Sequence, residues 1–181
     1  MSDVEQVVLL DERAAPVGTT PKSTVHGADT PLHLAFSCHV LDDDGRVLIT
    51  RRALSKQTWP GVWTNTFCGH PGPGEDLEAA VHRRARVELG LALDDVTLTL
   101  PDFRYRAVDA SGVVENEVCP VFVAHATGPL HPDPDEVAEW AWVEPSDVAA
   151  AVSAAPWAFS PWLGLQVPRL ALYDTAARAA R

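Results

Sequence analysis

The segment that most constrains the fold is Thr64–Pro71, with the sequence TNTFCGHP. It carries a thiol at Cys68 and an imidazole at His70, and in an extended segment side chains two positions apart share one face. Both groups would then point into the same cavity. The other candidate metal ligands lie far away in the sequence, at His26, His33, Glu115 and Glu117. A fold that uses them together must bring several separate stretches to one place.

The rest of the chain is typical of mixed α and β structure. Apolar or alternating runs predict strands at Val7–Leu10, Leu32–Leu41, Val47–Thr50, Phe103–Arg106, Val114–Val123 and Trp140–Val143, with extended chain inside Trp59–Pro71. Asp42–Gly45 predicts a hairpin turn, and a turn is also expected around Pro16 and Gly18. Helices are expected at Leu77–Leu89 before Gly90, from a cap at Ser146 to Ala154, and over Pro168–Ala180. The fold class expected is α/β (α+β), a sandwich in a single domain.

The charge distribution bears on the class of ligand. The 181 residues carry a net charge of −11, which argues against nucleic-acid binding. Eight of the 14 Lys and Arg residues fall between positions 51 and 106, a basic middle that suits a small anion. No apolar run approaches the roughly 18 residues of a membrane span, and the acidic N-terminus does not resemble a secretion signal. Three cysteines are too few for a disulfide framework. We therefore expect a cytoplasmic protein with no membrane partner.

Two carboxylates begin the run Glu115–Val123. Glu115 and Glu117 project from one face of a strand, and the apolar residues that follow indicate that this strand enters the core. An arbitrary pair of this kind is usually just exposed charge at a strand end. Like charges beside a core need a neighbouring cation, which a metal would supply.

Histidines supply the other candidate ligands. His33 lies among apolar neighbours in Leu32–Phe36, where a polar ring needs a specific partner. Three imidazoles and two carboxylates form a larger set than a structural tetrahedral zinc site, and suit a five- or six-coordinate Zn²⁺, Mn²⁺ or Mg²⁺. The remaining histidines are interpreted as ordinary surface or core residues: His39, His82, His125 and His131.

A third pattern begins at Gly69. Gly69, Glu75, Arg83, Glu88, Gly90 and Leu91 have the spacing of the Nudix box, a loop and helix that hold magnesium against a diphosphate. Arg84 and Val87 stand where that box has glutamates, and Ala85 stands at its first bulky apolar position. A hydrolase uses its glutamate cluster to bind several ions and activate water. The loss of two carboxylates should cripple hydrolysis and leave Glu88 to hold one magnesium.

Taken together, the motifs resemble those of the type I isopentenyl-diphosphate isomerases, non-hydrolytic relatives of the Nudix hydrolases. The resemblance is carried by Leu32–Ser37, Thr50–Lys56, Trp59–Asn65, Cys68–Pro71, Tyr105–Ala107, Glu115–Val121 and Trp157–Trp162. It implies a Nudix-like mixed-sheet sandwich flanked by helices. Within one domain, residues 1–30 would form an N-terminal strand and a metal- and diphosphate-binding segment, 31–165 the isomerase core, and 166–181 a C-terminal helix.

The resemblance also implies residue roles. His26, His33, His70, Glu115 and Glu117 would bind one divalent metal, and Glu88 a Mg²⁺ shared with the substrate diphosphate. Lys22, Arg52 and Lys56 would contact that diphosphate, with Arg83 a further candidate. Cys68 and Glu117 would be the acid/base pair, assisted by Tyr105 and Trp162. Which of the pair gives the proton stays open.

The implied reaction moves the double bond of isopentenyl diphosphate to give dimethylallyl diphosphate, in isoprenoid biosynthesis. Protonation of the alkene gives a tertiary carbocation, so the site needs a proton donor, a base and a dry pocket. An aromatic face such as Trp162 stabilises the cation, although core packing explains that residue nearly as well. The alternatives are a Nudix-type diphosphate hydrolase and a catalytically silent metal-bound module. The partner expected is a small diphosphate, for a monomer or weak homodimer.

Overall fold

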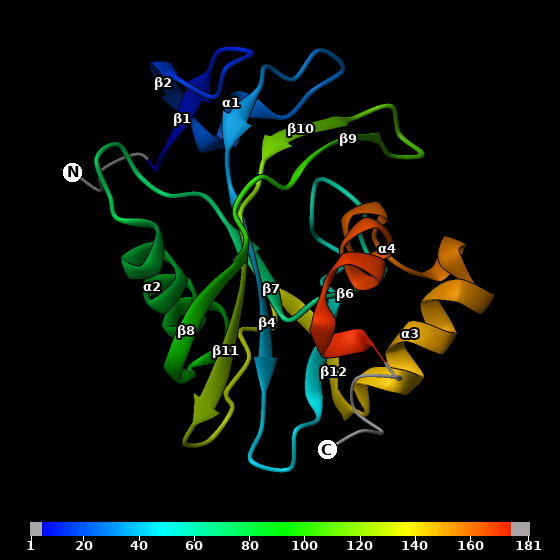
Figure 1. Ribbon diagram of the computed structural model, residues 1–181. Coiled ribbons are helices and arrows are strands. Elements are labelled where there is room, and N and C mark those ends of the chain that lie inside the picture. Colours follow the sequence, from blue (N-terminus) through cyan, green and yellow to red (C-terminus); the bar gives the residue numbers. More distant parts are fainter. Residues whose placement is uncertain (1–4, 175–181) are drawn as a thin grey trace.

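Two mixed β-sheets form the frame of the protein, whose computed structural model describes residues 5–174 (Figure 1). The smaller sheet has the order β2-β1-β3-β10-β9, from β1 (Gln6–Leu10), β2 (Pro16–Pro21), β3 (His33–Leu34), β9 (Arg104–Val108) and β10 (Val114–Val118). The larger sheet has the order β12-β5-β4-β11-β8, from β4 (Phe36–Leu41), β5 (Val47–Arg52), β8 (Ala92–Leu100), β11 (Val121–Thr127) and β12 (Val137–Val143). Short strands β6 (Trp63–Thr64) and β7 (Phe67–Gly69) pair with β5 and β4. The expected mixed-sheet architecture is confirmed.

The chain crosses between the two sheets twice, at the same place. Strand β3 runs parallel to β10 in the smaller sheet, and their continuations β4 and β11 run parallel in the larger one. Backbone hydrogen bonds tie the two crossings, from Ala35 N to Val118 O (2.9 Å) and from Ser37 N to Pro120 O (3.0 Å). The single strands predicted over 32–41 and 114–123 are therefore each two strands. Pro120 explains the second break, because proline cannot donate to a strand ladder.

Helices cover both faces of the larger sheet (Figure 1). Helix α2 (Leu77–Leu89) packs on one face, while α3 (Pro145–Ala154) and α4 (Pro161–Gln166) pack on the other. The strands alternate accordingly: Leu48 belongs to the core under α2, and Val47 and Ile49 to the core under α3 and α4. The result is a three-layer arrangement with the smaller sheet at one end.

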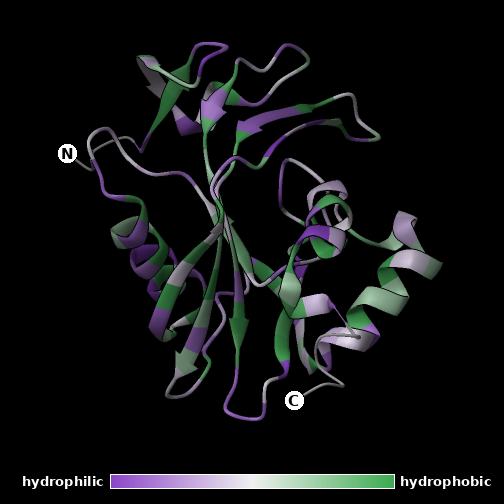
Figure 2. Cartoon of the chain, viewed as in Figure 1, coloured by the Kyte–Doolittle hydropathy of each residue, from purple (hydrophilic) through white to green (hydrophobic). Residues whose placement is uncertain are grey.

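Local signals explain helix α2, which has the bounds expected from the sequence. Asp76 precedes it and accepts a hydrogen bond from Ala79 N (3.1 Å), which satisfies one free N–H of the first turn. Gly90 ends it with φ of 58°, a left-handed conformation that favours glycine. Hydrophilic and hydrophobic residues alternate along this helix (Figure 2), and Val81, Ala85 and Leu89 are buried against the larger sheet.

The hairpin turn at Asp42–Gly45 is confirmed, with a backbone bond from Asp42 N to Arg46 O (3.0 Å). Two strands were missed: residues 16–21 form β2 rather than a turn, and 92–100 form β8. Both are largely exposed edge strands, which explains the weak alternation of their sequences. Among the described residues, no helix combines the length and apolarity needed to cross a membrane.

Two helix predictions need correction. Helix α3 begins at Pro145 after Glu144, so Ser146 lies inside the first turn and is not the cap. This start suits proline, whose missing N–H would have no helical partner there. The helix expected over 168–180 is wrong for 168–174: the chain makes two 3-10 turns, Val167–Arg169 and Ala171–Tyr173, separated by an extended Leu170. Residues 175–180 lie outside the described part.

Candidate active site

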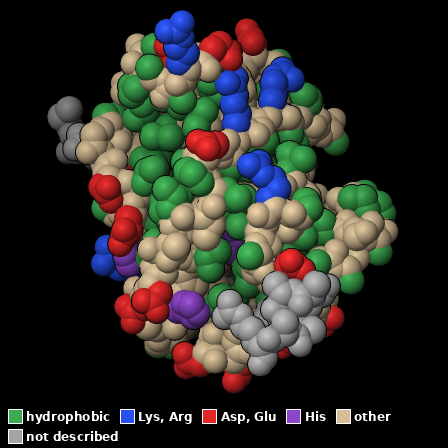
Figure 3. All heavy atoms as spheres, in the orientation of Figure 1, with side chains coloured by type: hydrophobic (Ala, Val, Ile, Leu, Met, Phe, Trp, Pro, Cys, Tyr) green, Lys and Arg blue, Asp and Glu red, His purple; other side chains and the backbone are tan. Residues whose placement is uncertain are grey.

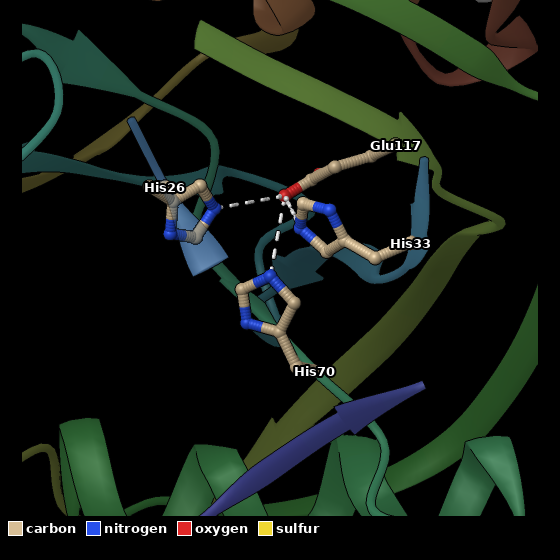
Figure 4. A group of neighbouring side chains, drawn as sticks. All are labelled: His26, His33, His70 and Glu117. Atoms are coloured by element: carbon tan, nitrogen blue, oxygen red, sulfur yellow. Dashed lines mark hydrogen bonds and ion pairs between the residues drawn. The ribbon is translucent and has the colours of Figure 1, made fainter. Parts of the chain in front are cut away.

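Three histidines and one glutamate meet where the smaller sheet ends (Figure 4). His26 follows α1 (Lys22–Val25), His33 lies on β3, His70 follows β7, and Glu117 lies on β10. The Nε2 atoms of His26, His33 and His70 lie 4.0, 3.4 and 3.3 Å from the same oxygen, Oε1 of Glu117. Their possible ligand atoms all lie within 4.8 Å of one another. Four of the five expected metal ligands therefore come together.

The protonation of these groups fits a metal ion. His33 Nδ1 contacts the carbonyl oxygen of Pro31 at 2.9 Å and must donate to it, which leaves the Nε2 lone pair facing the cluster. The Nε2 atoms of His26 and His33 are buried and have no hydrogen-bond partner among the described residues. Lone pairs directed at a carboxylate repel it unless a cation lies between them. This group is therefore suited to hold a divalent metal.

The pKa values of the cluster show that Glu117 stays a carboxylate and favours positive charge beside it. Burial would raise the pKa of Glu117, but the three surrounding imidazoles hold it well below its usual range. Burial lowers the pKa of His70 to about 4, so this ring is neutral and able to bind a metal. The pKa of His33 is raised, because the Glu117 carboxylate outweighs the effect of burial. A proton and a metal would compete for this ring.

Glu115 lies beside the cluster and is not part of it. Its carboxylate accepts hydrogen bonds from the hydroxyls of Thr58 and Tyr105. The Tyr105 hydroxyl also contacts Oε2 of Glu117 at 2.9 Å, so it links the two carboxylates. Burial and the charge of Glu117 both raise the pKa of Glu115. The prediction that Glu115 and Glu117 share a face is confirmed.

A cavity of about 420 Å³ opens next to the cluster. Cys68, Tyr105, Trp162 and both carboxylates line it together with His70. Burial, with the negative charge of Glu117, raises the pKa of Cys68 to about 12, so this residue is a thiol at neutral pH. The expected placement of Cys68 and His70 on one cavity is confirmed.

The indole of Trp162 forms an aromatic wall of this cavity and has contacts on several sides. The Trp162 ring is buried, and its Nε1 donates to Oδ1 of Asn65 at 2.9 Å. Its ring centroid lies 5.6 Å from that of Tyr105 and 5.4 Å from that of Trp59. The Arg52 guanidinium lies 5.4 Å from the ring centre, within cation–π range. An indole held on several sides is able to present its face to a cation.

Basic side chains also line the cavity: Lys22, Arg52, Lys56 and Arg84. Lys22 pairs with Glu5 at 3.1 Å, and Lys56 pairs with Glu136. In Figure 3 most of the visible Lys and Arg side chains lie near the smaller sheet, with Asp and Glu both among them and at the opposite end. The four basic side chains on the cavity suit an anionic ligand.

The similarity to known proteins agrees with this geometry. Residues 31–163 match the NUDIX domain. A protein of Clavibacter michiganensis is 61% identical over 97% of this chain and 95% of its own length, and one of Agromyces mediolanus is 66% identical over 93% and 82%. Both are named isopentenyl-diphosphate Delta-isomerase. The chain belongs to this isomerase family.

The architecture of this chain also occurs in a solved structure of low sequence identity. A crystal structure of a Deinococcus radiodurans protein has a TM-score of 0.71 to this chain, with 20% identity, and covers 91% of this chain and 98% of its own. A likeness at this identity supports the architecture alone.

The position of one basic residue, Arg83, differs from the sequence prediction. Arg83 does not line the cavity; it makes a two-point pair with Glu75, with Nε at 2.7 Å and Nη2 at 2.8 Å from the carboxylate oxygens. Arg84, one position later on α2, is buried, pairs with Glu88, and lies 3.4 Å from Glu136. Adjacent helix residues point about 100° apart, and the spacing alone did not identify which arginine faces inward.

Proposed function

We propose that this chain interconverts isopentenyl and dimethylallyl diphosphate by proton addition and removal, with Cys68 and Glu117 as the acid/base pair. One observation carries the proposal: a thiol and a carboxylate from separate sheets line one cavity, beside a cluster suited to a metal. The name carried by the relatives supports the same reaction.

The chemistry requires two proton-transfer groups around one alkene. One proton is added at a terminal carbon and another is removed two carbons away, so charge and atoms balance over the reaction. Cys68 is a thiol at neutral pH and Glu117 a carboxylate, so one of the pair carries a proton and the other can accept one. The Tyr105 hydroxyl, which contacts both Glu115 and Glu117, orients the Glu117 carboxylate.

The carbocation needs protection between the two transfers. Trp162, packed between Tyr105 and Trp59, would lie against the substrate and stabilise positive charge with its ring face. The same buried wall excludes water, which would otherwise trap the cation as an alcohol.

The metal would be held by His26, His33, His70 and Glu117, with Glu115 adjacent. Three imidazole nitrogens favour Zn²⁺ or Mn²⁺ over Mg²⁺, which prefers oxygen ligands. Such an ion supplies positive charge that offsets the buried carboxylates and fixes the orientation of Glu117.

The diphosphate would bind at the basic side chains of the cavity. Lys22, Arg52, Lys56 and Arg84 supply four positive charges there, and Arg84 replaces Arg83 as a candidate. Glu88 remains the proposed ligand of a Mg²⁺ that accompanies the substrate. Since Arg84 already pairs with Glu88, this ion would have to share the carboxylate with the guanidinium.

Deuterium uptake tests the proposal most directly. Purified protein in heavy water should introduce deuterium into both five-carbon diphosphates, and a chelator should stop this. Release of phosphate from nucleoside diphosphate derivatives, without alkene isomerisation, would identify a hydrolase instead.

Cys68→Ala tests the thiol. General acid–base groups contribute about 10²–10⁴-fold to the rate, so turnover should fall at least about 100-fold. Cys38→Ala is a matched control, since Cys38 is a buried thiol of the core under α2 and does not line the cavity. Substantial activity in folded Cys68→Ala would remove this residue from its role.

A further inference from the structure

A buried chain of hydrogen bonds leads from the C-terminal turns to Cys68. The Tyr173 hydroxyl lies 2.8 Å from His39 Nδ1, and His39 Nε2 lies 2.9 Å from Gln166 Oε1. Gln166 Nε2 lies 2.9 Å from Ser37 Oγ, which in turn lies 3.2 Å from Cys68 Sγ. The four residues behind Cys68 are at most 4% exposed.

The amide of Gln166 fixes which atom donates in each of these hydrogen bonds. Its oxygen only accepts, so His39 must carry its hydrogen on Nε2. His39 is neutral, because burial lowers its pKa to about 4, so its Nδ1 accepts and Tyr173 donates. The amide nitrogen only donates, so it occupies a lone pair of Ser37 Oγ. The hydroxyl hydrogen of Ser37 is then left for a sulfur atom.

No other polar neighbour of the Cys68 sulfur is equally available. Asn65 Nδ2 and Oδ1 each lie 3.5 Å from it, the oxygen as a possible acceptor of the thiol hydrogen, but this oxygen already accepts from Trp162 Nε1 and Thr64 Oγ1, both at 2.9 Å. Both hydrogens of the Asn65 amide are bound to backbone carbonyls at 3.0 and 2.8 Å. Ser37 therefore offers the one well-placed hydroxyl donor to this sulfur among the described residues.

A second sulfur lies near the same hydroxyl. Cys119 Sγ is 3.4 Å from Ser37 Oγ, but it is fully buried and does not line the cavity. Its thiol hydrogen is able to fill the remaining lone pair of Ser37. This arrangement leaves the hydrogen of Ser37 for Cys68.

We propose that Ser37 is a positioning residue for Cys68, and that Gln166, His39 and Tyr173 hold its hydroxyl hydrogen toward the sulfur. The inference rests on the proposed role of Cys68. A sulfur that accepts from Ser37 on its inner side directs its own hydrogen, or its free lone pair, into the cavity. Hydrogen bonds to charged groups are stronger than those to neutral ones, so Ser37 contributes most while Cys68 is giving up its proton.

Ser37→Ala removes the donor. Loss of a hydrogen bond to a developing charge should lower kcat about 10- to 100-fold and leave KM nearly unchanged, because Ser37 does not line the cavity. Thr66→Val is the matched control: Thr66 is equally buried, and its hydroxyl bonds to the backbone at Leu48 O (2.6 Å) and Val40 N (2.8 Å). It should lower Tm similarly and leave kcat within about threefold.

Gln166→Glu changes the direction of the hydrogen bond between residue 166 and Ser37 while it keeps the packing of the side chain. Glutamate has nearly the same shape and still accepts from His39, but it cannot donate once it is ionised; because burial raises the pKa of a carboxyl group, kcat is compared at alkaline pH, where residue 166 is ionised. Ser37 must then donate to residue 166, and its hydrogen is withdrawn from Cys68. kcat should fall as far as in Ser37→Ala, and in the double variant the two losses should not add.

The outcomes separate this inference from the proposal on which it rests. Circular dichroism and Tm identify the folded variants; if Ser37→Ala does not fold, Gln166→Glu carries the test. Wild-type kcat in the folded variants, or losses that multiply in the double variant, would overturn the role of Ser37. Activity retained in Cys68→Ala would overturn the proposed function instead. A kcat loss that follows Tm equally in Thr66→Val would reduce Ser37 to a packing residue.

Discussion

Two buried histidines six positions apart show what distinguishes a metal ligand from a core residue. His33 and His39 are both fully buried, on the successive strands β3 and β4. Both nitrogens of His39 have partners, Tyr173 and Gln166. In His33 one nitrogen is bound to Pro31 and the other faces Glu117 without a hydrogen bond. Burial does not separate the two roles, whereas the balance of donors and acceptors does.

The same contrast extends to their surroundings. The His33 region holds the buried carboxyl groups of Glu115 and Glu117 beside three imidazoles, and the carboxylate of Glu117 leaves negative charge for a cation to offset. The partners of His39 are an amide and a phenol, so no charge is left over. The prediction that His39 is a core residue with satisfied nitrogens and not a metal ligand is confirmed, although the same hydrogen bonds connect it to the residues behind Cys68. His82 is half-buried, and His125 and His131 are exposed.

The strongest challenge to this contrast is Glu117→Gln. The change keeps the shape of the side chain but removes the charge that the imidazoles surround and a group proposed for proton transfer. Turnover should fall by at least about 10²–10⁴-fold, with loss of bound metal. Elemental analysis and isomerase assays of the same preparation check this. Full metal content with wild-type turnover would contradict the cluster.

Removal of one imidazole from each region should separate metal binding from packing. His33→Ala should lower metal affinity and activity at least about 100-fold, since even indirect partners of metal ligands contribute 10- to 100-fold. His39→Gln should retain the metal. Chelation should lower the Tm of wild type and His39→Gln but not of His33→Ala, because a ligand at 1,000 times its Kd stabilises by about 4 kcal/mol. Equal responses in all three would remove His33 from the site.

The pH dependence of the free energy of unfolding tests the His39 part of this comparison. Burial lowers its pKa from 6.5 to about 4, so the unfolded chain binds a proton there at a higher pH than the folded chain does. The free energy of unfolding should therefore fall as pH drops from 6.5 to about 4, by about 3 kcal/mol for this residue. Urea unfolding across this range should show a flatter profile for His39→Gln. An identical slope in both proteins would contradict a neutral His39.

The smallest effect is expected at His82. This ring lies on the outer side of α2, 3.9 Å from Glu78, and surface pairs of this kind contribute little. His82→Ala should change stability by less than about 0.5 kcal/mol and leave metal content and activity unchanged. It serves as the histidine control for the preceding variants.

Periodicity predicted the parts of the site that lie close together in the sequence. The alternation of a strand put Cys68 with His70 and Glu115 with Glu117, and both pairs face the cavity. The bounds of α2 followed from the helical periodicity of Leu77–Leu89 and from Gly90, while its cap at Asp76 is seen only in the structure. These features depend on the local geometry of a strand or helix, which can be predicted from neighbouring residues in the sequence.

Contacts between distant segments could not be predicted in the same way. Ser37 and Gln166 are 129 positions apart, and no local pattern links them. The choice between Arg83 and Arg84 depends on how α2 is rotated against the sheet, and therefore on packing. The division of 114–123 did have a signal in Pro120, but its effect, a change of sheet, depends on the partner strand.

The double crossing between the sheets has a consequence for tolerated changes in chain length. His33 pairs with Glu117 in the register of β3 and β10, and only four positions later Ser37 reaches the sulfur of Cys68. An insertion or deletion of one residue here would rotate one of the two side chains to the opposite face. Length variation should therefore be confined to outer loops such as 42–45. The number of residues in the stretch 33–37 should stay constant, because it sets the distance between the metal ligands and the thiol.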